Sequence, residues 1–285
     1  MNKYKKIAYL LLLFYSFLYH TQSYEQVDLK GEFTYKLKAK FDRRSDNRYE
    51  ELFMLQVVDR KAFFASINSI KRDSVLELDN SRVTTHNADG SITLSIKKGV
   101  IIPETPYYFT IIQTNENIQY FDYAAMSLFA YKQPVISNWE LADETKIINT
   151  ITCKKAKVEF KGRNWIAWYA PEIPLPYGPM KFSGLPGLII KITDEKEDYD
   201  FELVKSLSVS QLKGKFISIK KSRYTGAIET TQATLKQAQK TADENAAAVL
   251  ASYGTTIIQG QEMIKQRERS REENKKYGNP LELSE

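Results

Sequence analysis

A stretch rich in glycine and proline, residues 178–187, constrains the fold most strongly. It reads Gly-Pro-Met-Lys-Phe-Ser-Gly-Leu-Pro-Gly and leads directly into an apolar run. Such a composition requires a sharp turn, and Leu188, Ile190 and Ile192 on one face then predict a buried strand. Pro186 and Gly187 suit the two central positions of a type II turn. Alternatively, the glycines let a ligand or a partner backbone approach closely.

The rest of the chain has the pattern of an antiparallel β protein. Hydrophobic residues make up 42% of the sequence, with 18 tyrosines and 14 phenylalanines, a composition that favours aromatic-rich sheets. Short segments of alternating or continuous apolar residues, separated by turns, predict strands. The segments are 33–41, 50–59, 62–64, 75–78, 92–96, 106–112, 118–123, 151–160, 165–169, 188–192, 199–203 and 215–219. We therefore expect a mainly β fold, a curved antiparallel meander or half-barrel.

Three regions are expected along the chain. Residues 1–23 form a signal peptide, residues 24–225 the antiparallel β domain, and residues 226–285 a C-terminal helix with a charged tail. The helix is predicted to open near Gln232 and to end near Ser252, where Gly254 follows. Alternating charges from 261 to 276 predict a second, solvated helix.

The first residues predict export. Lys3, Lys5 and Lys6 precede an apolar stretch that is shorter than a membrane-spanning helix, and small residues allow cleavage near Ser23. The mature chain would then be periplasmic or extracellular and without a transmembrane segment. Loss of the three lysines takes the formal charge from +6 to +3, and without a recognisable motif we expect no nucleic-acid partner.

The scarcity of cysteine and histidine excludes several kinds of chemistry. Cys153 is the single cysteine, so no intramolecular disulfide forms, and His86 is the one histidine after the signal peptide. A zinc site built from clustered His and Cys is therefore not expected, and His86 is placed in a polar loop. Cys153 is either a buried small hydrophobe or a thiol activated by Lys154 and Lys155. With no phosphate loop or nucleophile elbow, we expect no enzyme, no cofactor and no metal.

The candidate binding or structural residues lie in and before the glycine-proline stretch. They combine large aromatic side chains with turn residues, which either line a ligand groove or pack a core. They are Trp139, Trp165, Trp168, Tyr169, Gly178, Pro179, Gly184, Leu185, Pro186 and Gly187.

The literal string Gly184-Leu-Pro-Gly-Leu-Ile189, with Trp165-Ile-Ala-Trp-Tyr169 and Ile173-Pro174 before it, resembles the GLPGLI family of secreted proteins from Bacteroidetes-type bacteria. The likeness extends to 153–156 and to the ending Asn279-Pro-Leu-Glu-Leu283. The resemblance implies secretion, and the family brings no established activity. The predicted sheet also resembles the open half-barrels of periplasmic lipoprotein carriers of the LolA type and, less closely, lipocalins, an analogy of fold that transfers no function.

Two functions from different classes follow as hypotheses. The first is a non-enzymatic secreted protein that binds a lipid or another apolar or amphipathic ligand in a curved aromatic sheet. The alternative is an envelope accessory protein that docks a protein partner through an edge strand or the charged tail. A hydrolase using distant acids is a third reading.

Overall fold

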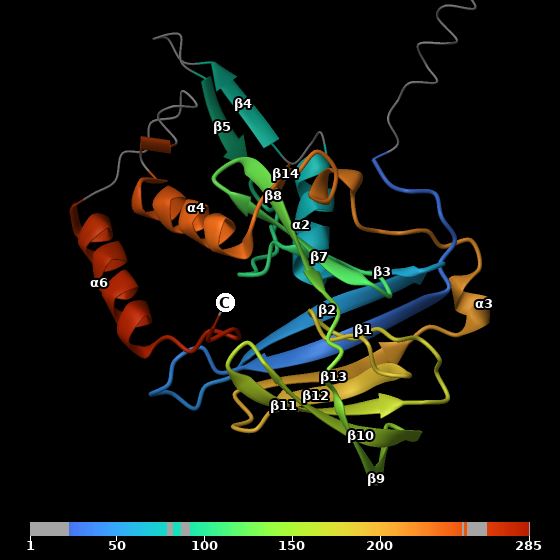
Figure 1. The fold of residues 1–285 in the computed structure, drawn as a ribbon. Coiled ribbons are helices and arrows are strands. Elements are labelled where there is room, and N and C mark those ends of the chain that lie inside the picture. Colours follow the sequence, from blue (N-terminus) through green and yellow to red (C-terminus); the bar gives the residue numbers. More distant parts are fainter. Residues whose placement is uncertain (1–22, 79–81, 87–91, 247, 250–260, 285) are drawn as a thin grey trace, which may run out of the picture.

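The fold is seen in a computed structural model that describes residues 23–284, apart from 79–81, 87–91, 247 and 250–260 (Figure 1). The predicted signal peptide lies outside the described residues except for Ser23. The predicted turn at Asp89 and Gly90 and the predicted helix end near Ser252 also fall outside them. No helix within the described residues is long and apolar enough to cross a membrane.

Twelve strands form one large sheet, and two more form a separate hairpin. In spatial order the large sheet contains β14 (Ile228–Glu229), β8 (Ser127–Pro134), β7 (Asn117–Ala124), β6 (Thr110–Gln113), β3 (Lys61–Ser66), β2 (Tyr49–Val58), β1 (Gly31–Ala39), β13 (Tyr199–Ser206), β12 (Leu188–Asp194), β11 (Arg163–Ala170), β10 (Ile151–Phe160) and β9 (Glu140–Ile148). The hairpin pairs β4 (Arg82–His86) with β5 (Ile92–Ile96).

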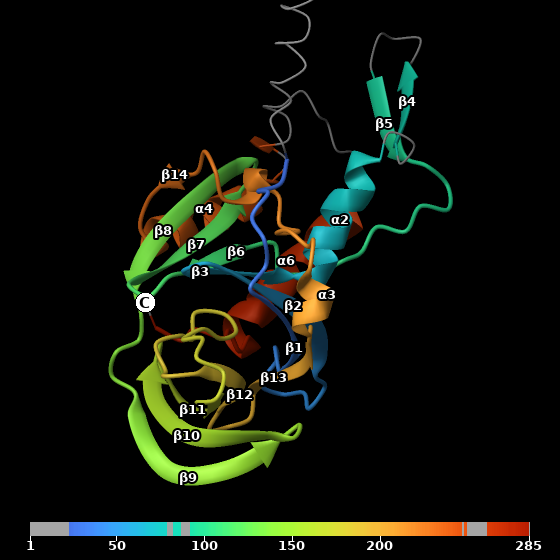
Figure 2. The ribbon, with the colours of Figure 1, turned by 90° about the vertical axis from the view of Figure 1, so that its right-hand side faces the viewer.

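The prediction of a mainly antiparallel, curved β fold is confirmed. Every pairing in the large sheet is antiparallel except the short contact between β14 and β8. Two meanders meet at β1, which pairs with β2 on one side and with β13 on the other. The sheet stays open, with β14 and β9 as its edges, and Figure 2 shows its C-shaped cross-section.

The strand β1 shows how the sequence pattern produces the curved sheet. Phe33, Tyr35, Leu37 and Ala39 are buried on the concave face, and the lysines between them point outward. Because side chains alternate between faces along a strand, this register places every apolar residue of β1 in the core. Lys36 forms an ion pair of 2.6 Å with Glu50 on the neighbouring strand, so part of the outer lysine row is neutralised.

The concave face is filled by the protein's own chain. Residues 171–187, which we call the crossing, run between β11 and β12 inside the curve of the sheet (Figure 2). Residues 177–183 of the crossing are all buried. The crossing and the concave side chains of both meanders form one hydrophobic core.

Four α-helices are described, and the first two of them were not predicted from the sequence. They are α2 (Ile67–Glu77), α3 (Val209–Leu212), α4 (Gln232–Glu244) and α6 (Gln261–Tyr277). The predicted strand segment at 75–78 instead overlaps the last turn of α2. This helix begins after Ser66, whose side chain accepts a hydrogen bond of 3.1 Å from the Ser69 backbone N–H and caps the helix. The two C-terminal helices agree with the predicted helical segments.

Two further sequence interpretations were wrong. Residues 215–219 form no strand, because the Ser218 backbone N–H donates to the Gln56 side chain, and pairing is limited to one bridge between Asp28 and Phe216. His86 ends the strand β4 and is not in a loop, since the β-branched residues Val83, Thr84 and Thr85 favour extended backbone.

Candidate functional site

The predicted turn in the glycine-proline stretch differs from the one observed. Gly187 has a φ of 159°, which is close to extended and far from the value of about +80° that a type II turn needs. A tighter turn forms instead, in which the Gly187 N–H donates to the Leu185 carbonyl at 2.8 Å. A Cβ on Gly187 would lie 2.2 Å from the carbonyl oxygen of Ala170. Glycine is therefore required here by close packing of two backbones.

Most of the predicted site residues pack around the crossing. Trp165 is buried with its ring 4.6 Å from that of Phe182, and the Trp139 indole N–H donates to the Ser183 carbonyl at 2.9 Å. Trp168 lies apart from them, because it alternates to the other face of β11 and sits near the ammonium groups of two lysines. Of the remaining candidates, Tyr169, Gly178, Pro179, Leu185 and Gly187 are buried, while Gly184 and Pro186 are exposed.

A row of aromatic rings runs along one half of the sheet, from β2 through the segment before β6 to β7 and β8. Ring centroids lie 6.2 Å apart between Tyr49 and Tyr107, 5.8 Å between Tyr107 and Phe109, 5.3 Å between Phe109 and Tyr120, and 5.1 Å between Tyr120 and Tyr131. Tyr107, Phe109 and Tyr120 fall in the predicted strand segments 106–112 and 118–123, but they were not among the predicted site residues. Each of these contacts has the spacing of a favourable aromatic pair.

The row borders a cavity of about 250 Å³ between the sheet, the crossing, α4 and the last residues of the chain. Tyr107, Phe109, Tyr120, Tyr131, Met180, Leu235 and Leu281 supply most of its apolar wall. Lys181, Glu282, Asp122, Gln232, Gln239 and Lys236 supply polar groups, and Pro106 completes the lining. An aromatic wall combined with polar groups is typical of small-molecule sites.

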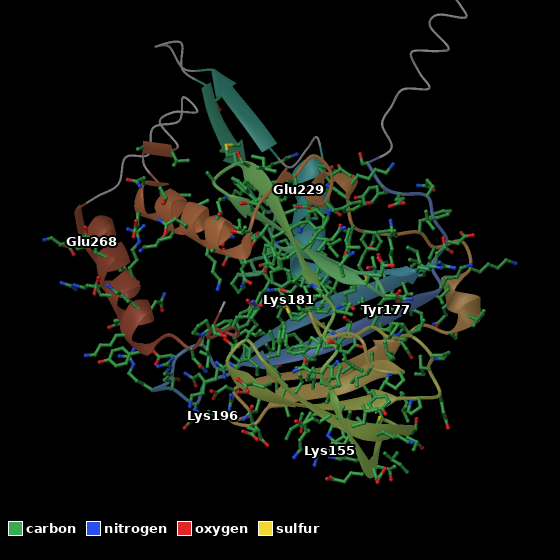
Figure 3. The ribbon with its side chains drawn as sticks, in the orientation of Figure 1. Lys155, Tyr177, Lys181, Lys196, Glu229 and Glu268 are labelled. Atoms are coloured by element: carbon green, nitrogen blue, oxygen red, sulfur yellow. The ribbon has the colours of Figure 1, made fainter. Side chains whose placement is uncertain are left out.

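Lys181 is the buried cation of this cavity. Its ammonium group donates to the Tyr131 hydroxyl at 2.7 Å and pairs with the carboxylate of Glu282. It also lies 4.8 Å from the centroid of the Tyr120 ring, a favourable cation–π distance. Figure 3 shows Lys181 near the middle of the molecule, while Lys155 and Lys196 lie at its periphery.

The surroundings of Lys181 act on the pKa of its ammonium group in two opposite directions. Burial lowers the pKa of the ammonium group, and the nearby carboxylate of Glu282 opposes that shift. A lysine carries three N–H donors, and within the described part of the chain two of them have partners. One donor therefore remains for an acceptor atom of a ligand.

Tyr107, another residue that lines the cavity, carries a second unsatisfied polar group. Its hydroxyl is buried and has no hydrogen-bond partner among the residues described. Burial also raises the pKa of this phenol well above its ordinary value, so the group stays protonated and can donate. An unpartnered buried hydroxyl is costly unless something bonds to it.

Asp122 lies where the cavity meets a second, larger cleft. The cleft has a volume of about 620 Å³, and Pro106, Asp122 and Gln239 line both spaces. Asp122 accepts hydrogen bonds from the Gln239 amide at 3.0 Å, the Tyr120 hydroxyl at 3.2 Å and the Tyr123 backbone N–H at 2.8 Å. Burial nevertheless raises the pKa of the Asp122 carboxyl.

The polar residues of the cavity were not predicted from the sequence. Lys181 stands between Met180 and Phe182, and a lysine inside an otherwise apolar run was the available signal for a buried cation. Asp122 and Glu282 gave no comparable signal, because nothing in the sequence shows that the β7 strand and the last residues meet. Within the described residues, no group of three or more His, Cys, Asp or Glu side chains is placed to hold a metal ion.

Comparisons with known proteins identify a short family match. A model for a family described as "Protein of unknown function (Porph_ging)" matches residues 158–191, which include β11, the crossing and the first residues of β12. The resemblance to the GLPGLI family remains a prediction. No curated protein matches the chain.

Two solved structures resemble the fold at a distance. They are entitled "Structure of PNGF-II in C2 space group" and "Structure of PNGF-II in P21 space group". Both share 14% identity with this chain and cover 74% of it, with TM-scores of 0.48 and 0.46. The chain spans about a third of their length, 32% and 33%, and a likeness of this degree says nothing of function.

Proposed function

We propose that the protein is an exported, non-enzymatic binding protein that holds a small amphipathic ligand in the cavity beside Lys181. The observation that carries the proposal is an aromatic-walled cavity lined by Lys181, which has a spare N–H, and by Tyr107, whose buried hydroxyl is unpartnered among the described residues. The basic start and apolar stretch of residues 1–23 support export.

The proposed site differs from the one expected along the curved sheet. The crossing fills the concave face, so the aromatic residues there contact one another and the crossing. In the cavity at the rim, by contrast, four aromatic rings border open volume. Its size, about 250 Å³, is slightly below the usual range for small-molecule pockets, which favours a ligand with a single ring or a short chain.

The polar groups of the cavity define the head group of the ligand. Lys181 and Tyr107 each offer a donor, and the exposed ammonium group of Lys236 stands at the wall. These groups favour an oxygen acceptor. A cation is disfavoured because the two carboxylates that also line the cavity, Asp122 and Glu282, already accept from protein donors. Because Glu282 already balances the charge of Lys181, a neutral hydroxyl or carbonyl is sufficient.

Calorimetric titration with three compounds that share one body tests the proposal. Phenylbutanol and phenylbutyrate should bind with one site per chain, and phenylbutylamine should bind at least about tenfold more weakly, a difference of about 1.4 kcal/mol. Equal binding of all three, or binding of none, would refute the proposed site.

Two variants connect the binding to the cavity. Tyr107→Phe removes the unpartnered hydroxyl, and Leu235→Phe adds volume to the wall; both should weaken binding of phenylbutanol. The matched control is Tyr224→Phe, which removes a hydroxyl bonded to Glu25 outside the cavity and should leave binding unchanged. Equal losses in the control and in Tyr107→Phe would contradict the assignment.

A further inference from the structure

A short segment after α6 is bound by the rest of the protein as an extended peptide would be. Residues 279–284, which we call the strap, leave the end of α6 and cross the open side of the sheet (Figure 1). Arg163 from β11 is almost fully buried and donates to the carbonyls of Pro280 at 2.7 Å and Leu281 at 3.0 Å. One side chain thus binds two successive backbone carbonyls of the strap.

Asn279 is the deepest residue of the strap, at 5% exposure. Its side-chain oxygen accepts from Arg163 at 2.6 Å, and its side-chain amide donates to the Lys40 carbonyl at 2.8 Å. Its backbone N–H donates to the Phe41 carbonyl at 2.8 Å, and its backbone carbonyl accepts from the Tyr199 hydroxyl. All four polar groups of Asn279 are therefore recognised.

The far end of the strap is held at the cavity. The Glu282 carboxylate pairs with Lys181 and accepts from the Gln232 amide at 2.6 Å. The backbone N–H of Leu283 donates to the Lys161 carbonyl at 2.9 Å. Charged and backbone groups together give the specificity expected of a peptide site.

The helix that carries the strap is joined to the body mainly by polar contacts. None of the α6 side chains that the structure describes is buried. Arg271 pairs with Asp243 of α4, and the Arg44 guanidinium lies 3.8 Å from the centroid of the Tyr277 ring. A helix whose described side chains are all outside the core gains little from packing and is suited to bridge through solvent. With its 17 residues, α6 spans about 25 Å.

We propose that two copies of this chain exchange their straps, so that residues 279–284 of one copy occupy the Arg163–Lys181 site of the other. An element that is bound strongly at its tip and weakly along its arm can be exchanged between identical chains at a low cost in free energy. The cost is low because every contact of the strap is re-formed in the other copy. Leu281 and Glu282 line the ligand cavity, so each cavity of the pair is completed by the other copy.

A charge reversal distributed over two chains tests the exchange. Lys181→Glu alone places two carboxylates together, and Glu282→Lys alone places two ammonium groups together. In a mixture of these two chains, exchanged straps restore opposite charges at both sites. Native mass spectrometry should then find heterodimers in large excess over either homodimer. The control is the chain with both substitutions, in which opposite charges are restored within one molecule. It shows whether the fold tolerates the reversed ion pair.

Wild-type protein provides the second measurement and needs no substitution. Chains with and without ¹⁵N are mixed at the highest soluble concentration, and mixed-label dimers should form and should be lost in Arg163→Leu and Asn279→Ala. Mixed-label dimers that persist in both variants, or wild-type protein that stays monomeric, would overturn the exchange. The readout is mass and not ligand affinity, so this result is independent of the test with phenylbutanol.

Discussion

The side chain of Gln113, the last residue of β6, binds Gly178 through both of its polar atoms. The Gln113 amide donates to the Gly178 carbonyl at 2.8 Å and to the Met180 carbonyl at 2.6 Å, and its oxygen accepts from the Gly178 N–H at 3.3 Å. Gln113 and Gly178 are 65 positions apart in the sequence. One glutamine thereby supplies the hydrogen bonds that an irregular buried segment would otherwise lack.

Gln113→Leu should destabilise the protein by at least about 3 kcal/mol. The substitution leaves three buried backbone groups of the crossing without partners, each costing about 1–3 kcal/mol. The matched control is Gln133→Leu, because the Gln133 side-chain oxygen is buried without a partner among the described residues. Urea denaturation measures both, and equal losses would show that Gln113 does not support the crossing.

Gly187→Ala should destabilise strongly, by about 3 kcal/mol or more. Its Cβ would contact the Ala170 carbonyl oxygen at 2.2 Å and the Pro171 Cα at 3.0 Å, so backbone must move. Gly214→Ala is the control, since it has a φ of +74° but nothing within 4 Å of the added atom, and it should cost only about 1 kcal/mol. Thermal melts that rank the two variants in the reverse order would contradict the packing argument.

Cys153 should be inert in the native protein. The thiol is fully buried, and burial raises its pKa to about 11, so almost no thiolate exists near neutral pH. Of the two sequence interpretations, the structure thus supports a small buried hydrophobe, and Lys155 is engaged by Glu144 at 2.8 Å. An aromatic disulfide reagent should label Cys153 only as fast as the protein unfolds. Rapid labelling under native conditions would contradict the burial.

The contribution of Asp122 to the free energy of unfolding should fall as the pH rises above the ordinary carboxyl pKa of 3.8. Its folded pKa is raised above 3.8, so in that window the folded state binds more protons than the unfolded state. Asp122→Asn removes this dependence. The free energy of unfolding of the variant, minus that of the wild type, should therefore increase from about pH 4 to about pH 7.

Asp42 provides a control of opposite sign. Hydrogen bonds from Arg44 lower the pKa of its carboxyl to about 2, so its contribution is present above the ordinary pKa and is lost as the pH falls. The window lies between the lowered pKa of about 2 and the ordinary value of 3.8. As the pH rises through it, the free energy of unfolding of Asp42→Asn should therefore fall relative to that of the wild type. Urea denaturation across pH checks both variants, and identical trends for the two would refute these assignments.

The sequence predicted local strands better than their assembly. The alternation in β1 and the apolar segments 106–112 and 118–123 are local patterns, and they correspond to β1, β6 and β7 of the sheet. The pairing of β1 with β13 joins residues such as Leu37 and Phe201 that are far apart in the chain. The alternation of apolar residues within one strand carries no information about which strand will pair with it. The helix α2 was missed because its start depends on one capping serine, Ser66.

The candidate site was harder to predict for a related reason. Trp165 and Tyr169 were chosen as large aromatic residues, and the structure buries both in the core. The cavity instead combines Tyr107, Lys181 and Glu282 from three separate segments. A buried ion pair is formed only when the fold brings its members together, so Lys181 and Glu282 could not be connected from their surroundings in the sequence.

Native mass spectrometry of the protein isolated from the envelope of its own source tests the central claim most directly. The account predicts one small molecule per chain, retained by the wild type and lost in Leu235→Phe, whose added ring occupies the cavity. A clean chain mass in both proteins, or equal retention of the molecule by both, would contradict a ligand site beside Lys181.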